Sequence, residues 1–175
     1  ELGILALPPR EPPRLRVEER LLINSFKSVG EPAVAAGLLG AAAIAATGTP
    51  EQKERFLSRF GGDKPVFDAM AMTEPHAGSA MPAETRTTAV RDGDHWVLNG
   101  EKIFVTGGHK ALLDTQGFVV VWATIDPSAG RAGVRRFVIE AGTPGCTVTK
   151  LEHKLGIRAS DTASVVLQDC RIPFE

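Results

Sequence analysis

The chain has 175 residues, of which 43% are hydrophobic and 23% are charged, and its formal net charge is -1. This length suggests one domain or two small ones, and the composition is ordinary for a globular protein. A nearly neutral chain carries no long-range field that would favour nucleic acid as a partner. The longest apolar run, residues 33–46, falls short of the about 20 residues that a bilayer span needs, so we expect no membrane span.

Cysteines and histidines give no sign of a metal site. Cys146 and Cys170 form no CxxC arrangement, and the four histidines have no ligand spacing. We expect neither a metal site nor a disulfide framework, which favours a reducing, cytoplasmic location. The chain begins with Glu1 and no signal-peptide pattern follows, which suggests a processed or trimmed chain.

Apolar periodicity predicts three helices in the first part of the chain. Residues 14–29 repeat apolar positions at helical spacing, and residues 33–46 are apolar nearly all round, which indicates burial on most sides. Residues 49–52 (TPEQ) form a capping box with Pro at the first helical position, so a third helix is expected to run to about Phe60.

From Lys64 onward, short segments rich in β-branched and aromatic residues alternate with turn residues. Asp92-Gly93 and Asn99-Gly100 suit two-residue hairpins, whose turns need positive φ. An almost wholly apolar segment, residues 117–125, is typical of a strand covered on both faces. We expect strands at residues 66–73, 84–91, 95–98, 101–106, 117–125, 134–141, 146–150 and 163–170.

These elements predict an α+β fold. A partial N-terminal helical bundle would occupy residues 1–63, and an antiparallel β-barrel or two-sheet domain would occupy residues 64–175. Closure or a second sheet is the natural solution for about eight strands because it leaves few exposed edges.

The segment MAMTEPHAGSA, residues 70–80, is the first candidate for a functional site. A strand here runs into a tight loop of Pro, Ala, Gly and Ser, which can present several backbone N–H groups and a hydroxyl to an anion such as phosphate. Thr73 adds a hydroxyl and an amide at the end of the strand. A plain strand-to-loop junction in which Ser79 caps a turn fits the same residues, so both interpretations stay open.

A second segment, WVLNGEKIFVTGG at residues 96–108, ends in Thr106 followed by glycines. Phe104, taken alone, would serve equally well as a core aromatic residue. Two strands that each end in Thr could, however, hydrogen-bond the polar edge of a planar heteroaromatic ring while an aromatic residue covers its face. The common nucleotide, zinc and serine-hydrolase motifs are absent from the sequence, so any nucleotide cofactor must bind in another way.

Together these segments resemble the middle domain of the flavin-dependent acyl-CoA dehydrogenases. Residues 70–80 are similar to the family's aromatic-x-hydrophobic-Thr-Glu-Pro-x-Ala-Gly-Ser-Asp segment, and residues 96–106 are similar to W-x-(I/L/V)-N-G-x-K-x-(W/F)-(I/V)-T. Residues 156–162 and the terminal residues 171–173 are similar to a G-x-R-x-S-D-T segment followed by a strand and V-P. The resemblance covers roughly residues 33–175.

The resemblance implies FAD as the cofactor. Thr73 would hydrogen-bond the pyrimidine edge of the isoalloxazine beside the Met72 backbone, and such donors stabilise the anionic reduced ring. The FAD pyrophosphate would lie near Gly78 and Ser79, and Ser79 would also contact substrate. Phe104 would lie against the flavin, with Val105 and Thr106 near N5. The implied cofactor-binding residues are Met70, Met72, Thr73, Gly78, Ser79, Phe104, Val105 and Thr106.

The resemblance also implies a reaction in fatty acid metabolism. A carboxylate removes the α-proton of an acyl-CoA thioester while the β-hydrogen leaves as hydride to flavin N5, which gives trans-2-enoyl-CoA. The implied partners are the acyl-CoA substrate, an electron-transfer flavoprotein and further subunits of a homo- or hetero-oligomer. The implied location is the cytoplasm, or the mitochondrial matrix in a eukaryote.

In this family the base belongs to a C-terminal helical domain, which is absent from these residues. We therefore expect no catalytic residue in this chain, a structural role for Glu74, and a longer parent protein. Three residues depart from the family pattern: Ala80 stands where Asp is usual, Met70 where an aromatic is common and Phe104 where Trp is common. A non-catalytic subunit or scaffold of the same fold, and an acyl-CoA oxidase or flavin monooxygenase, stay open as alternatives.

Overall fold

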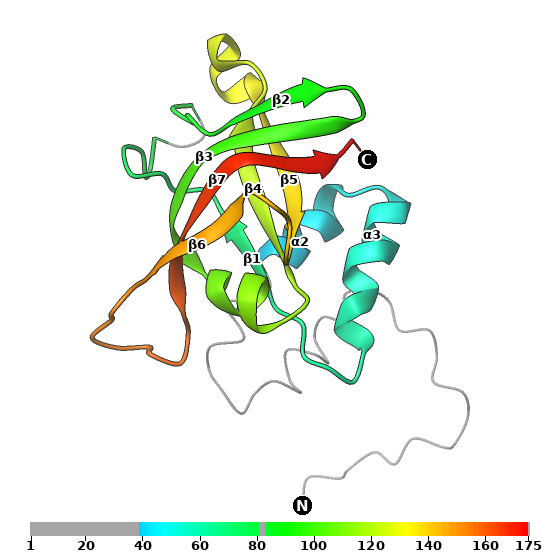
Figure 1. The fold of residues 1–175 in the computed structure, drawn as a ribbon, viewed down its shortest axis with the longest axis vertical. Helices are drawn as coiled ribbons and strands as arrows, with labels where there is room; N and C mark the ends of the chain where they lie inside the picture. The colour runs from blue at the N-terminus through cyan, green and yellow to red at the C-terminus, as the bar shows by residue number, and fades with distance from the viewer. Residues whose placement is uncertain (1–38, 81–82, 175) are drawn as a thin grey trace, which may run out of the picture.

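The computed structural model describes residues 39–80 and 83–174 (Figure 1). Helix α2 (Leu39–Thr47) is followed by α3 (Pro50–Leu57) and a short 3-10 helix, η2 (Ser58–Gly61). The predicted capping box of α3 is confirmed, because Gln52 N donates to Thr49 Oγ1 and Thr49 N donates to Gln52 Oε1. No helix in the described part has the length and hydropathy to cross a bilayer. The helix expected at residues 14–29 lies outside the described residues.

Seven strands form one curled sheet in the described part of the chain. Their order is β1-β4-β2-β3-β7-β6, and β5 pairs with the other edge of β4, beside the helices. Two short helices, η3 (Lys110–Asp114) and η4 (Pro127–Gly133), flank β4. The strands are β1 (Asp68–Ala71), β2 (Thr88–Asp92), β3 (His95–Thr106), β4 (Phe118–Thr124), β5 (Val134–Glu140), β6 (Cys146–Leu151) and β7 (Thr162–Pro173).

The predicted α+β class is confirmed, and the sheet is mixed where uniform antiparallel pairing was expected. The first four residues of β4 pair in parallel with β1, and Thr124 at the end of β4 pairs in parallel with β2. The other pairings are antiparallel. Parallel neighbours are possible because β4 is buried along almost its whole length, as its apolar sequence predicts.

The hairpin predicted at Asp92-Gly93 is confirmed with its loop shifted by one residue to Gly93-Asp94, since Asp92 pairs with His95, whereas the hairpin predicted at Asn99-Gly100 is wrong. Strand β3 runs straight through Asn99-Gly100, where its pairing with β7 shifts register. Gly100 has φ 152, and a Cβ there would lie 2.5 Å from Thr87 Oγ1, so the glycine allows β2 to pack closely. Asn99 exchanges hydrogen bonds with Asp169, whose own φ is 48. The dipeptide therefore marks a bulge rather than a turn.

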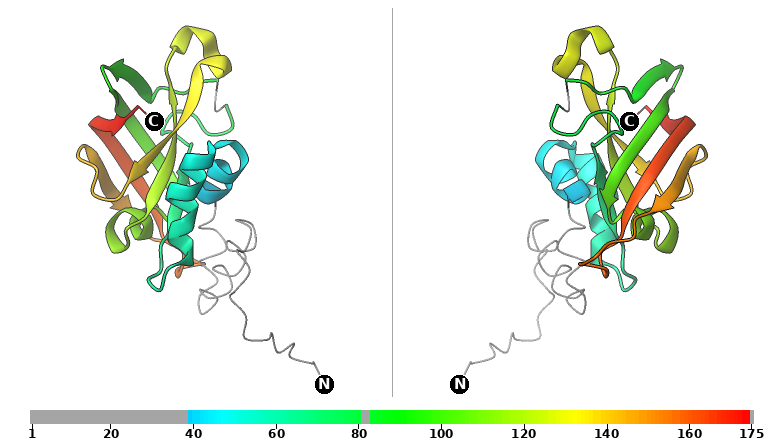
Figure 2. Two further views of the ribbon diagram at one scale, coloured as in Figure 1. Left: turned by 90° about the vertical axis from the view of Figure 1, so that its right-hand side faces the viewer. Right: turned by 90° about the vertical axis from the view of Figure 1, so that its left-hand side faces the viewer.

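Strand β4 separates two apolar clusters. Val119 and Val121 point into the curl of the sheet, whereas Phe118 and Val120 pack against the helices. The Phe118 ring lies 5.3 Å from that of Phe56, measured between centroids. Figure 2 shows that α2 and α3 cover one face of the sheet, which leaves the far side of β3 and β7 without a helical layer in the described part. The division at residues 63 and 64 stays a prediction.

Candidate cofactor-binding site

The three sequence motifs come together at one end of the sheet. Thr73, the second residue after β1, joins the second motif, since Ile103 N donates to Thr73 O at 2.9 Å. The third motif joins the end of β3, where Thr106 pairs with Thr162. Asp161 adds two contacts to the glycine-rich turn that follows, because its carbonyl accepts from Gly107 N and its carboxylate accepts from His109 N at 2.8 Å. Segments far apart in sequence thus form one surface.

A bulge in β3 turns Phe104 outward. The pairing of β3 with β7 shifts register between Lys102 and Val105, and Phe104 within the shift has φ 56. A left-handed conformation costs a non-glycine residue about 1–2 kcal/mol, so the local structure must enforce it. Val105 is buried in the core, whereas Phe104 is 61% exposed. The interpretation of Phe104 as a core aromatic residue is therefore wrong.

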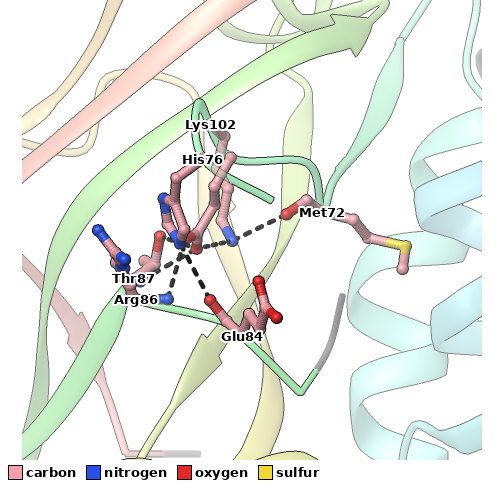
Figure 3. Close-up of polar contacts among 7 residues, drawn as sticks. Met72, His76, Glu84, Arg86, Thr87 and Lys102 are labelled. Carbon is pink, nitrogen blue, oxygen red and sulfur yellow. Dashed lines mark hydrogen bonds and ion pairs between the residues drawn. The ribbon is translucent and has the colours of Figure 1, made fainter. Parts of the chain in front are cut away.

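A buried ion pair lies beneath this surface, between the first and second motifs. Lys102 Nζ lies 2.7 Å from Glu74 Oε1, and both side chains are almost fully buried. The same ammonium donates to Met72 O at 3.1 Å. Figure 3 shows the Met72 side chain pointing away from this network, toward the helices.

The Glu74 carboxylate is saturated with hydrogen bonds. Besides Lys102, it accepts from Arg86 N at 2.8 Å, from Thr87 N at 3.0 Å and from Thr87 Oγ1 at 2.6 Å. Burial favours a raised pKa for Glu74, but the hydrogen bonds from Lys102, Thr87 and Arg86 outweigh it and lower the pKa. Burial also lowers the pKa of Lys102, against the opposing effect of Glu74. An ionised, fully bonded carboxylate cannot act as a general base, which supports the expected structural role of Glu74.

The hydroxyl groups of Thr73 and Thr106 remain available for a ligand. Both residues are half-buried, and neither hydroxyl has a hydrogen-bond partner among the described residues. With Phe104 they form a surface that has two polar donors and an exposed aromatic face. Such a surface can hold a flat heteroaromatic ring by its polar edge.

The loop after Thr73 is exposed beyond its first turn. Glu74 and Ala77 exchange two backbone hydrogen bonds, each of 3.1 Å. A Cβ on Gly78 would meet no atom of the described residues within 4 Å, and the φ of Gly78 is not in the left-handed region. The described fold therefore does not require glycine at this position. Ser79 is exposed, and its hydroxyl caps no turn within the described residues. Both interpretations of this loop stay predictions.

Among the predicted residues, the structure brings Thr73, Phe104, Val105 and Thr106 together and buries Val105. Met70 and Met72 lie on the helix-facing side of the sheet, because Ala69 and Ala71 point into the curl. Sequence reasoning missed Lys102, whose period-2 spacing from Leu98 places it on the buried face of β3. The described residues contain no cluster of three His, Cys, Asp or Glu side chains that could hold a metal.

Comparison with known proteins adds independent information. Residues 69–170 match the family profile described as acyl-CoA dehydrogenase, middle domain. A cyclohex-1-ene-1-carbonyl-CoA dehydrogenase of Geobacter metallireducens is 42% identical over 128 residues, which are 73% of this chain and 32% of that protein. The chain thus spans about a third of the length of the curated relatives it matches.

Solved structures agree with this match. The butyryl-CoA dehydrogenase of Megasphaera elsdenii has a TM-score of 0.74 and 35% identity, covering 90% of this chain and 41% of that one. A glutaryl-CoA dehydrogenase of Mycobacterium smegmatis, solved in complex with FADH2, has a TM-score of 0.67 and 34% identity, with coverage of 90% and 38%.

Proposed function

The chain belongs to the acyl-CoA dehydrogenase family, and from this premise we propose that its protein is an FAD-dependent oxidoreductase that converts acyl-CoA thioesters to trans-2-enoyl-CoA. The observation that carries the proposal is the convergence of the three motifs on one surface. There, Thr73 is hydrogen-bonded to Ile103, the neighbour of the exposed Phe104, and Thr106 follows Phe104 by two residues; neither threonine hydroxyl has a partner among the described residues.

The residues present fit FAD in their donor chemistry. Hydroxyl and amide groups at Thr73 and Thr106 match the polar edge of an isoalloxazine, and the exposed Phe104 matches its apolar face. The loop at Gly78 and Ser79 is exposed, and no described atom lies within 4 Å of a Cβ placed on Gly78, so its backbone is accessible to a pyrophosphate. We assign FAD binding to Met70, Met72, Thr73, Gly78, Ser79, Phe104, Val105 and Thr106, and a substrate contact to Ser79.

The chain's own residues bind and orient in this proposal, and FAD supplies the hydride acceptor. Thr73 and Thr106 would fix the ring in its plane by hydrogen bonds. Phe104 would exclude water from one face of the ring. Met70 and Met72 would contribute through backbone and packing from the neighbouring strand end. Glu74 would remain ionised beneath the site and take no part in proton abstraction.

The proposal extends to the protein that carries the chain. A helical part, residues 1–63, would precede the flavin-binding β domain, residues 64–175, and the base that removes the α-proton would lie outside these residues. An electron-transfer flavoprotein would accept the electrons, and the protein would assemble into an oligomer. The free thiols of Cys146 and Cys170 are compatible with a reducing compartment, such as the cytoplasm or the mitochondrial matrix.

The test is turnover by the protein that carries this chain, purified with FAD and given butyryl-CoA with an artificial electron-accepting dye. We expect a stoichiometric flavin spectrum, bleaching of that spectrum by substrate, and formation of the enoyl-CoA. Release of peroxide with molecular oxygen as the acceptor would instead identify an oxidase. Absence of bound flavin from the complete protein would contradict the proposal.

A further inference from the structure

We propose that Lys102 is a positioning residue that fixes and polarises the Thr73 amide, and thereby raises the reduction potential of the flavin. This inference rests on the proposed function above, because it concerns the edge at which Thr73 would meet the isoalloxazine. Lys102 itself contacts neither flavin nor substrate in this account, since its side chain is completely buried.

The contacts of Lys102 bracket Thr73 in the sequence. Its ammonium donates to the carbonyl of the preceding residue, Met72, and to the carboxylate of the following residue, Glu74 (Figure 3). The next residue of β3, Ile103, donates its N–H to the carbonyl of Thr73 itself. Two consecutive residues of β3 therefore fix the peptide groups before and after Thr73.

Peptide geometry converts these contacts into an orientation for the Thr73 amide. In a trans peptide group, the C=O of one residue and the N–H of the next point in opposite directions. Because Lys102 binds the Met72 carbonyl, the Thr73 N–H is directed away from Lys102. Among the described residues this N–H has no acceptor, so it is available to a ligand together with the Thr73 hydroxyl.

The charge of Lys102 adds a polarising effect. A cation at a peptide carbonyl strengthens the N–H of the same peptide as a donor, because hydrogen-bonded groups polarise one another in a low-dielectric interior. A stronger donor favours the reduced ring, which carries more negative charge at its polar edge, over the oxidised ring. The Glu74 carboxylate keeps the ammonium ionised by direct contact and holds it at the Met72 carbonyl.

Fold stability alone is a poor explanation for this pair. Replacement of a buried ion pair by apolar groups of similar volume is often neutral or stabilising, because two charges must be desolvated to form the pair. The fold could therefore be held by uncharged side chains. The direct bond from the cation to Met72 O is the feature that an uncharged pair would lack.

The test compares the flavin reduction potential of the FAD-loaded protein with that of the Lys102→Met/Glu74→Gln double variant, which removes both charges at nearly constant volume. The matched control is Arg171→Met/Asp92→Asn, which removes an exposed ion pair of the same 2.7 Å length from the same sheet. We expect the double variant to bind reduced flavin at least tenfold less well relative to oxidised flavin, a fall of about 30 mV for a two-electron couple. The control should keep the wild-type potential.

An unchanged potential in a double variant that binds FAD overturns this proposal and leaves the proposed function intact. Failure of the wild-type protein to bind FAD would instead contradict the proposed function. Should the double variant not fold, the wild-type protein supplies the test by nuclear magnetic resonance. Coupling between two groups is reciprocal, so the side-chain ammonium ¹⁵N signal of Lys102 must shift when the flavin is reduced. Lys150, on an exposed edge, serves as the reference, and an unshifted Lys102 signal overturns the proposal.

Discussion

Two buried carboxylates, Asp68 at the start of β1 and Glu74 just beyond its end, show opposite behaviour. Asp68 Oδ1 accepts from Gly40 N at 2.7 Å and from Ala41 N at 3.1 Å, while Oδ2 has no partner within the described residues. Burial raises the pKa of Asp68 to about 7, against the effect of these two bonds. The pKa of Glu74 is lowered despite its burial.

The difference between these carboxylates comes from the number and the charge of their hydrogen-bond donors. Asp68 has only backbone donors at the start of α2, and these do not compensate for the loss of water. Glu74 has the same kind of neutral donors and, in addition, the ammonium of Lys102. At the start of β1, Asp68 therefore binds the first turn of α2 at the cost of desolvating its own carboxyl group. Beyond the end of β1, Glu74 and Lys102 keep their buried charges as a hydrogen-bonded ion pair beside the candidate site.

The largest expected effect comes from breaking the pair at Glu74. Lys102→Met alone should lower the free energy of unfolding by about 3–5 kcal/mol, because it leaves an uncompensated buried carboxylate. The free energy of unfolding should fall clearly less in the Lys102→Met/Glu74→Gln variant, since neither charge remains. Urea unfolding of both variants measures the difference. A single variant that is as stable as the double variant would show that Glu74 does not depend on its cation.

At Asp68 we expect a smaller loss. Asp68→Ala should lower the free energy of unfolding by about 1–3 kcal/mol, because the buried N–H groups of Gly40 and Ala41 lose their acceptor. Asp68→Asn is the matched control, since its amide oxygen can still accept both bonds and it carries no charge to desolvate. Thermal or urea unfolding should rank the alanine variant below the asparagine variant. Equal stability of the two would contradict a capping role for Asp68.

The pH dependence of stability separates the two carboxylates further. Folded Asp68 retains a proton between its ordinary pKa of 3.8 and about 7, so its contribution to the free energy of unfolding falls as pH rises through that window. The slope reaches up to about 1.4 kcal/mol per pH unit. Glu74 acts in the opposite direction, because its lowered pKa means that stability is lost as pH falls below the ordinary value of 4.5.

The Asp68→Asn variant isolates this effect. Unfolding free energies of the wild type and the variant, measured from pH 4 to pH 7.5 in steps, should converge toward the acid end and diverge toward neutrality, with the variant relatively more stable. A constant difference across the range would show that Asp68 titrates normally.

The smallest expected effect concerns the bulge beside Lys102. Phe104→Gly should change stability little or raise it by up to about 1 kcal/mol, because glycine adopts the left-handed conformation without strain. The same change should weaken FAD binding, since the exposed ring no longer covers the flavin. Chemical unfolding and flavin fluorescence on one preparation measure both. Loss of stability with unchanged FAD affinity would contradict a ligand role for Phe104.

Sequence patterns predicted the features that local chemistry determines. The capping box of α3, the buried strand β4 and the hairpin at Asp92-Gly93 each follow from residues close together in the chain. The motifs with Thr73 and Thr106 were found because strand ends followed by small residues are recognisable locally. Their proximity to each other, however, depends on pairings that only the fold supplies.

The features that sequence reasoning missed depend on distant partners. Asn99-Gly100 has the composition of a turn, and its actual role depends on Asp169 in β7 and Thr87 before β2. Parallel pairing of β1 with β4 depends on the long connection between them. The alternation of β3 places Lys102 on its buried face, but nothing near it in the sequence shows that Glu74 lies opposite it. In each case the decisive contact joins residues far apart in sequence.

The central claim is that the surface formed by Thr73, Phe104 and Thr106 binds the flavin ring. Titration of the apoprotein with FAD, followed by flavin fluorescence, tests it most directly in the Thr73→Val/Thr106→Val variant. The control is Thr147→Val/Thr149→Val, which makes the same two changes on exposed positions of β6. We predict at least tenfold weaker FAD binding in the first variant and wild-type affinity in the second, whereas equal affinity in both would contradict the account.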